Sequence, residues 1–168
     1  MPNALQSCLL LLLFVPSAIS ALPIQAPACS NLDAHAPPAS GSTHLMSIDS
    51  DGAWVLAGDR EAASVGRVEV FRVLGDELEH AQTLTAPNPA GGDLFGHAVA
   101  VHGNVLAVGR PTHSSGDGSG AVHIFSLDAG VWQHALVLTN PQPSGVCKFG
   151  AVVQLSATRL VVGVHSCS

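Results

Sequence analysis

From residue 43 onwards, the chain is a series of short runs in which apolar residues either alternate with polar ones or follow one another without interruption. In the run Gly66–Val73, Val68 and Val70 alternate with charged neighbours, whereas Val105–Val108 is apolar throughout. Alternation predicts a strand with one buried face, and a short uninterrupted apolar run predicts a strand buried on both faces. Because no segment of the sequence shows a helical period, the pattern predicts an all-β fold.

The strand pattern recurs at a fixed interval. The pair Phe95–Gly96 returns at Phe149–Gly150, and the run Gly66–Phe71 returns at Gly120–Phe125, each 54 residues later. One interval is 51 residues instead, because the loop after the second strand of the first copy is three residues shorter. Length changes confined to loops indicate a structural repeat.

Each complete copy predicts a four-stranded antiparallel meander. The first copy covers residues 43–93, the second covers 94–147, and a partial third copy, 148–168, contains two strands. Repeats of this length with four strands each are typical of β-propellers, in which one sheet forms one blade. We therefore predict an incomplete β-propeller of about two and a half blades. A β-sandwich is the alternative, but its strands need not repeat at a fixed period.

The N-terminal region predicts a targeting segment followed by a linker. The apolar run Leu9–Val15 precedes small residues up to Ala21, a pattern typical of a cleaved secretory signal peptide, here residues 1–20. The run is shorter than the roughly 20 apolar residues that a bilayer requires, so we expect no stable membrane span. An uncleaved anchor is the alternative. Residues 21–42 are rich in Pro, Ala and Ser, which predicts an extended linker.

The charge balance excludes two classes of partner. The chain has 6 Lys and Arg residues against 12 Asp and Glu residues, for a net charge of −6 with neutral histidines. A nucleic acid or an anionic membrane surface needs a basic footprint. We therefore expect neither as a partner.

Removal of the signal peptide leaves Cys29, Cys147 and Cys167 in a compartment that permits disulfides. A hairpin turn centred on Ala157 predicts that the numbers of paired residues sum to 314 there, which brings Cys147 opposite Cys167. We predict a disulfide between them, which would contribute about 3 kcal/mol by closing a loop of roughly 20 residues. The alternative is two unpaired thiols, and no role is assigned to Cys29.

The residues Phe95–Gly96 and Gly109–Pro111 open and close one hairpin, and this arrangement resembles the FG-GAP repeat family, which includes the propeller heads of integrin α-subunits. The resemblance covers residues 43–168. It implies a β-propeller fold and a secreted, non-enzymatic module that binds an extracellular protein or glycan. The first copy departs from the family pattern, because Ser42–Thr43 stands in place of Phe-Gly.

Some members of the family bind calcium in the first hairpin of a repeat, which makes Asp49 and Asp51 candidate ligands. Calcium prefers six to eight oxygen ligands, so two carboxylates predict a weak site at best. The interpretation that we favour is a polar turn, and no other cofactor is expected.

The loop that follows the second strand of the second copy is the predicted binding surface, because a rigid sheet can hold a variable loop there. Its candidate residues are Arg110, Pro111, Thr112, His113, Ser114 and Asp117. His113 and His165 occupy corresponding loops and are the pair to test for a metal, although zinc needs three or four ligands. His80 and His134 share one repeat position, so a structural role in each blade explains both.

No catalytic set is recognisable in the sequence. The Gly-rich segment 114–120 joins two strands and therefore lacks the helix N-terminus that a phosphate site uses. We predict that the chain is not an enzyme, with two alternatives: the propeller part of a secreted hydrolase or oxidase, or a truncated fragment without independent function. The apolar run Leu160–Val164 predicts an open sheet edge, and such edges favour self-association.

Overall fold

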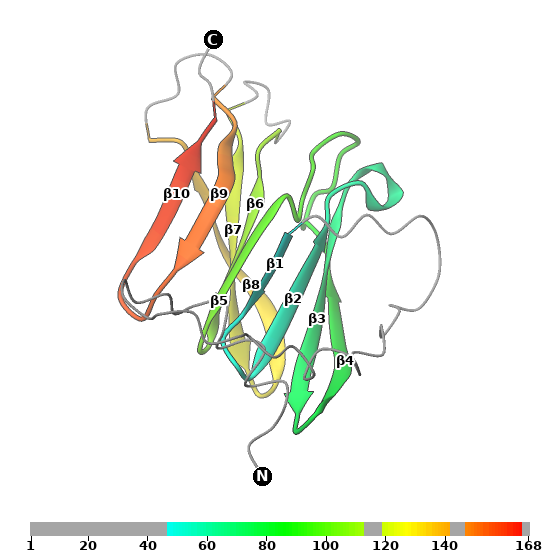
Figure 1. Cartoon of the computed structure of the whole chain (residues 1–168). Coiled ribbons are helices and arrows are strands. Elements are labelled where there is room, and N and C mark those ends of the chain that lie inside the picture. Colours follow the sequence, from blue (N-terminus) through cyan, green and yellow to red (C-terminus); the bar gives the residue numbers. More distant parts are fainter. Residues whose placement is uncertain (1–46, 113–118, 142–146, 166–168) are drawn as a thin grey trace, which may run out of the picture.

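The computed structural model of the chain describes residues 47–112, 119–141 and 147–165. These residues form three antiparallel sheets of four, four and two strands, which lie side by side in chain order (Figure 1). Within each sheet, strands that follow one another in the chain are also neighbours in space. The predicted signal peptide, 1–20, and the predicted linker, 21–42, lie outside the described residues and stay predictions.

The strand bounds follow the predicted copies. The first sheet contains β1 (Ser47–Ser50), β2 (Trp54–Asp59), β3 (Arg67–Leu74) and β4 (Glu77–Leu84). The second sheet contains β5 (Ala98–His102), β6 (Val105–Arg110), β7 (Ala121–Asp128) and β8 (Val131–Thr139). The third contains β9 (Phe149–Leu155) and β10 (Leu160–Val164), and a 3-10 turn, η1 (Ala62–Ser64), follows β2. This arrangement confirms the all-β prediction and is that of partial propeller blades.

The repeat in the sequence is also a repeat in backbone geometry. The pairing of β3 with β4 shifts at a bulge between Val70 and Phe71, and the pairing of β7 with β8 shifts between Ile124 and Phe125. These two bulges are 54 residues apart, the same interval that separates the sequence copies. The first two sheets therefore share one pattern of hydrogen bonding down to its irregularities.

Two details of the predicted hairpins are wrong. The polar turn predicted for the first hairpin includes Asp49, but Asp49 belongs to β1 and the turn starts at Asp51, whose carboxylate accepts hydrogen bonds from the N–H groups of Ala53 and Trp54. In the third sheet, the numbers of paired residues sum to 315 as far as Gly163 and to 313 at Val164, because a bulge separates the two. The predicted constant of 314 lies between them.

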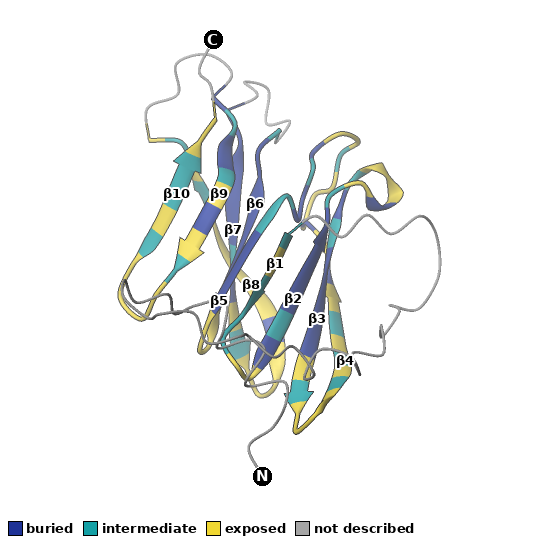
Figure 2. Cartoon of the chain, viewed as in Figure 1, coloured by how far each residue is buried: buried dark blue, intermediate teal, exposed yellow. Residues whose placement is uncertain are grey.

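The middle strands of the complete sheets are the most deeply buried (Figure 2). In β6, Leu106, Ala107 and Val108 have no exposed surface. Neighbouring sheets cover both faces of this strand, because β5 and β6 contact β9 on one side and the first sheet packs on the other. The prediction that Val105–Val108 is buried on both faces is confirmed for all but Val105, which is 39% exposed.

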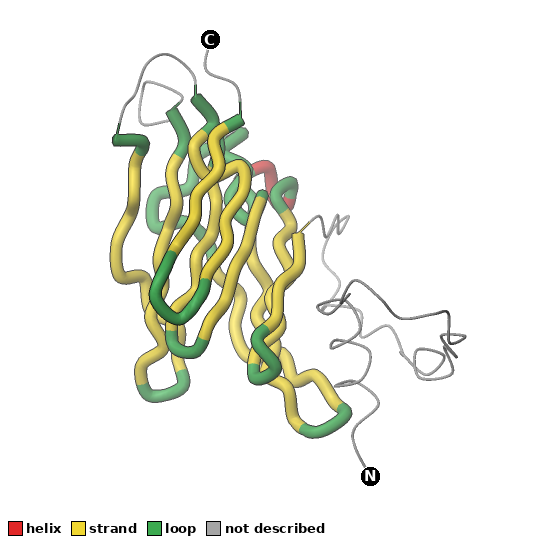
Figure 3. Tube along the Cα trace, turned by 60° about the vertical axis from the view of Figure 1, so that its left-hand side comes forward, coloured by secondary structure: helices red, strands yellow, loops and turns green. Residues whose placement is uncertain are grey.

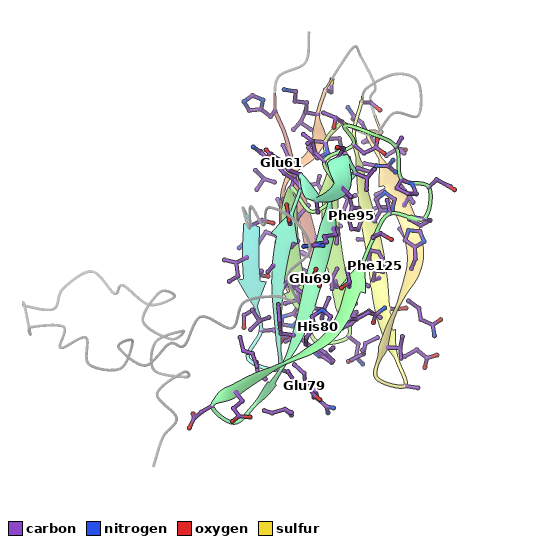
Figure 4. All side chains as sticks on the ribbon, turned by 90° about the vertical axis from the view of Figure 1, so that its right-hand side faces the viewer. Glu61, Glu69, Glu79, His80, Phe95 and Phe125 are labelled. Carbon is purple, nitrogen blue, oxygen red and sulfur yellow. The ribbon has the colours of Figure 1, made fainter. Side chains whose placement is uncertain are left out.

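The core between the first and second sheets is centred on aromatic side chains. Trp54 and Trp132 meet edge to face, with ring centroids 5.5 Å apart. Phe95 is completely buried and packs edge to face against Phe125, with ring centroids 6.3 Å apart (Figure 4). The side chain of Gln82 adds a polar link, because its amide donates to the carbonyl of Trp132 and accepts from the N–H of the same residue, each at 2.9 Å. The two sheets are thus held by apolar packing and by directed hydrogen bonds.

The Phe-Gly pairs attach each new sheet to the one before it. Phe95 forms an isolated parallel bridge with Gly66, and Phe149 forms the equivalent bridge with Gly120. Gly66 and Gly120 have positive φ angles of 83° and 82°, and a Cβ atom at either position would overlap the carbonyl of the bridging phenylalanine. Glycine is therefore required at both positions by conformation and by close approach.

The third sheet presents an apolar outer face. Val152 and Val161 are 63% and 59% exposed, whereas the residues 54 positions earlier, Ala98 and Ala107, pack against the third sheet. No further strand pairs with β10 among the described residues. Open edges of this kind favour self-association, which stays a prediction here.

Candidate functional site

The longer connections gather at one end of the sheets, opposite the tight β-hairpin turns (Figure 3). A cavity of about 550 Å³ opens at this end between loops of all three sheets. We call it the loop-end cavity, and its lining residues are Arg60, Glu61, Leu94, His97, Pro111, Thr112, Lys148, Ala151, Val152 and His165. The residues come from the ends of second strands and from the segments that flank the Phe-Gly pairs.

Basic groups dominate the polar lining of this cavity. The guanidinium Nη1 of Arg60 lies 3.1 Å from Nδ1 of His97. Because arginine can only donate, Nδ1 must accept, so the imidazole of His97 is neutral in this contact. The pKa of His97 is lowered from 6.5, first by burial and then by the positive charges of Arg60, Lys148 and His165. Arg60, Lys148 and His165 line the same cavity as His97.

Arg110, a predicted residue of the binding loop, is the last residue of β6 and is buried. Its side chain is 2% exposed and forms an ion pair with the fully buried carboxylate of Asp93. It also donates to the carbonyl of Asn88 at 3.0 Å. Its placement differs from the predicted loop because β6 continues through Arg110, which pairs with Ala121 in β7 and therefore lies inside the sheet; its binding role stays a prediction.

The comparison with known families matches the part of the chain that contains β6 and Arg110. The sequence model described as an FG-GAP repeat matches residues 79–125, which run from β4 into β7. The chain contains an FG-GAP repeat. The match includes Phe95–Gly96, which attaches the second sheet to the first, and Gly109–Pro111, where β6 ends. A search among curated proteins finds no match. The FG-GAP repeat and the three antiparallel sheets together identify a β-propeller-type repeat module.

The other predicted binding residues have different placements. Pro111 is buried, and Thr112 is half-buried; both line the loop-end cavity. The hydroxyl of Thr112 donates to the carbonyl of Gly92, in the loop that precedes Phe95 of the FG-GAP repeat. The predicted residues His113, Ser114 and Asp117 lie outside the described residues. The structure thus brings two of the predicted residues to the cavity.

Sequence reasoning missed Asp93 and the basic lining of the cavity. No sequence pattern identified Asp93, because its partner Arg110 is 17 residues away and belongs to another element. The basic residues could have been found by aligning the copies. Arg60 and His165 both follow the last glycine of a second strand by two residues, while His97 and Lys148 flank Phe-Gly pairs.

The calcium candidates Asp49 and Asp51 connect the first hairpin to the FG-GAP repeat. Asp49 Oδ2 accepts a hydrogen bond from the N–H of Val101, and Asp51 Oδ2 accepts one from the N–H of Gly103, each at 2.8 Å. Since Asp51 Oδ1 caps its own turn, three of the four carboxylate oxygens accept backbone N–H groups. These bonds tie the first hairpin to β5 and to the turn that follows it. The weak calcium site stays a prediction.

The histidines that share one repeat position have a common structural role. His80 Nε2 lies 2.8 Å from Oε2 of the buried Glu69, and its ring packs on Phe71 (Figure 4). In the second sheet, His134 Nε2 lies 3.1 Å from Nδ1 of His123, which occupies the position of Glu69. The same strand pair thus carries a buried polar contact in both complete sheets. Among the residues that the structure describes, no group of three or more His, Cys, Asp or Glu side chains could hold a metal ion.

Two further predictions concern the ends of the chain. Cys147 is fully buried, and no cysteine is free within the described ranges. Cys167 lies outside them, so its pairing with Cys147 stays a prediction. Over those same ranges, no helix is long and apolar enough to cross a membrane.

The lowered pKa of His97 predicts a pH-dependent stability. Because the unfolded chain has the higher pKa, it binds more protons than the folded chain as the pH falls below about 6.5. The contribution of neutral His97 is therefore complete above the unfolded pKa and is lost as the pH falls through the folded value. We expect the free energy of unfolding to decrease between pH 7.5 and 5, and His97→Gln to reduce that slope. Urea unfolding at several pH values measures it, and an unchanged slope in the variant would contradict the assignment.

Proposed function

We propose that the chain is a secreted, non-enzymatic β-propeller-type module that binds an extracellular protein or glycan through its loop end. The observation that supports this most directly is the loop-end cavity, which is formed by residues of three successive repeats. Rigid sheets hold these residues, while the loops that present them can differ in sequence. Variable loops held by rigid sheets are suited to recognising a ligand.

The chemistry of the cavity also favours binding over catalysis. Its described lining contains the cations Arg60 and Lys148, two histidines and one carboxylate, that of Glu61. Oε1 of Glu61 lies 3.8 Å from Nε of Arg60, a guanidinium that does not titrate. General acid–base catalysis needs titratable groups positioned on a reacting atom. A set of positive groups around a hollow is instead suited to holding a negatively charged ligand.

The test uses the full chain expressed in a secreting eukaryotic cell. We expect the protein in the medium, with its N-terminus near residue 21, and we expect it to capture ligands from arrays of extracellular proteins and glycans. Replacing residues 112–119 with an alanine and glycine segment of the same length should reduce capture at least tenfold. The matched control replaces Asp128–Gly130, the turn between β7 and β8 at the opposite end, and should leave capture unchanged.

Two results would count against the proposal. Capture that is equal in the loop variant and the control would show that the loop end is not the binding surface. Retention of the chain inside the cell with residues 1–20 uncleaved would contradict secretion.

A further inference from the structure

A groove of about 640 Å³ lies at the end of the sheets that carries the tight hairpin turns, opposite the loop-end cavity. The first strands of the three sheets line it, and β5 lies between β1 and β9 (Figure 1). We call it the first-strand groove, and its lining consists of residues 48–51, 99–103 and 153–155. Every one of these residues belongs to the part of the chain that the structure describes.

At the junction of the first and second sheets, two aspartates satisfy backbone donors at the edge of β5. Asp49 Oδ2 accepts a hydrogen bond from the N–H of Val101 at 2.8 Å. Asp51 Oδ2 accepts one from the N–H of Gly103 at the same distance. The carboxylates are two residues apart in the chain and so are the donors, which means that a short extended segment meets this edge in register. Because the N–H of Val101 donates to Asp49, it points away from β6.

The repeat places equivalent donors on the third sheet. Leu155 pairs with Leu160 of β10, and this pair holds the place in its hairpin that Val101 and its partner hold 54 positions earlier. Direction alternates along an antiparallel ladder, so equal places in the ladder have N–H groups that point the same way. The N–H of Leu155 therefore points away from β10, on the side of the groove that this residue lines. Ala157, in the exposed turn that follows, holds the place of Gly103.

The second sheet does not supply the acceptors that the first sheet supplies. The places of Asp49 and Asp51 are taken 51 residues later by Ala100 and His102. A methyl group cannot accept a hydrogen bond, and among the described residues no side chain accepts from the N–H of Leu155. The groove reaches both Ala100 and Leu155. An acceptor on a ligand can therefore occupy the place that Asp49 occupies one repeat earlier.

We propose that the first-strand groove binds an extended acidic segment of a partner protein, whose two carboxylates, two residues apart, accept hydrogen bonds from the N–H groups of Leu155 and Ala157. This site lies at the end opposite the loop-end cavity and does not rest on the proposed function. Carboxylate acceptors form charge-assisted hydrogen bonds, which are stronger than neutral ones. The exposed imidazole of His102 adds a donor, because even a neutral imidazole carries one N–H group.

Asp49 and Asp51 oppose the entry of further negative charge into the groove. Three of their four carboxylate oxygens accept backbone N–H groups, which offsets part of this repulsion. At an ionic strength of about 0.15 M, charges more than about 8 Å apart are largely screened. Binding is therefore measured at this ionic strength, where the donors in direct contact with the ligand decide the affinity.

The test uses the full secreted chain and a fluorescently labelled peptide of sequence Gly-Asp-Ser-Asp-Gly, which copies the spacing of Asp49 and Asp51. The matched ligand is Gly-Asn-Ser-Asn-Gly, which keeps the shape and removes both charges. We expect the acidic peptide to bind at least about fivefold more tightly in fluorescence anisotropy, because its acceptors are charged. In amide NMR spectra, the signals of Leu155 and Ala157 should shift on binding, because these N–H groups gain an acceptor.

Ala100→Asp supplies within the chain the carboxylate that Asp49 supplies one repeat earlier. We expect it to weaken binding of the acidic peptide about tenfold, because its own carboxylate accepts from the N–H of Leu155. His102→Asp makes the equivalent change at an exposed position, and it keeps the test decisive if thermal melting shows that Ala100→Asp does not fold. Ala129→Asp is the matched control, since it adds the same charge at an exposed turn outside the groove and should change the affinity less than about twofold.

Three results would overturn this inference. Equal binding of the two peptides, or no binding of either, would exclude the acidic segment as the ligand. An equal loss in Ala129→Asp would show that net charge alone governs binding. Amide shifts confined to the loop-end cavity would place the peptide at the other end of the sheets. Replacing residues 112–119 tests the proposed function and should leave peptide binding unchanged, so that the two proposals fail separately.

Discussion

Replacing Arg110 with methionine is expected to lower the free energy of unfolding by about 3–5 kcal/mol, because it removes one partner of a buried ion pair. The carboxylate of Asp93 would remain without its cation in a site where neither side chain has appreciable exposure. Arg110 also supplies a hydrogen bond to the carbonyl of Asn88, which would lose that donor. Since typical domains are stable by only 5–15 kcal/mol, a loss of this size should be visible as poor secretion or early unfolding.

The double variant Arg110→Met with Asp93→Asn separates the buried charge from other effects. An asparagine oxygen can still accept the N–H of Ala90, which Asp93 accepts in the native chain. We therefore expect the double variant to be more stable than Arg110→Met alone. Arg72→Met, at an exposed position, should change stability by no more than about 0.5 kcal/mol.

Urea unfolding of the four proteins measures these differences. If Arg110→Met were as stable as the native chain but captured its ligand more weakly, Arg110 would be a binding residue after all. The experiment therefore decides between the original loop prediction and the buried ion pair.

The fold was predictable because the repeat supplies its own consistency check. The run Val105–Val108 predicted a doubly buried strand, and the 54-residue interval then transferred the strand pattern from one copy to the next. The same interval recurs in the structure in the bulges at Val70 and Ile124. The predicted runs Gly66–Val73 and Val105–Val108 match β3 and β6 within one or two residues, whereas the first hairpin, which has the weakest match to the pattern, was displaced.

The site was less predictable, because it depends on contacts that have no period. Arg110 follows a glycine and precedes a proline, which is typical of an exposed turn, and arginine is rarely buried unless it is paired. Its burial follows from Asp93, which no strand or turn pattern identifies. The position 51 residues earlier is also charged and buried, since Asp59 lies 3.8 Å from Arg67 there. Comparing the copies for charge as well as for hydrophobicity would have revealed this position.

Replacing Phe95 with alanine is expected to have the largest effect of any single substitution in the core, about 3–5 kcal/mol. Its backbone forms a bridge with Gly66 in the first sheet, while its ring packs on His123 and Phe125 of the second, with centroids 5.5 and 6.3 Å away. The ring has no exposed surface and lies between the two sheets, so its removal leaves a cavity that neither sheet can fill by moving alone. We expect loss of cooperative unfolding as well as a lower midpoint.

Phe149→Ala is the matched comparison, because Phe149 occupies the same repeat position 54 residues later and bridges Gly120 in the same way. Phe149 is 9% exposed and joins the second sheet to a sheet of only two strands, so its side chain is less completely enclosed. We therefore expect a smaller loss of stability, with the contact between the first and second sheets intact. Urea unfolding monitored by the fluorescence of Trp54 and Trp132, which lie in that contact, distinguishes the two cases. Equal losses in the two variants would show that the Phe-Gly attachments are equivalent and that the core between the first two sheets is not the main source of stability.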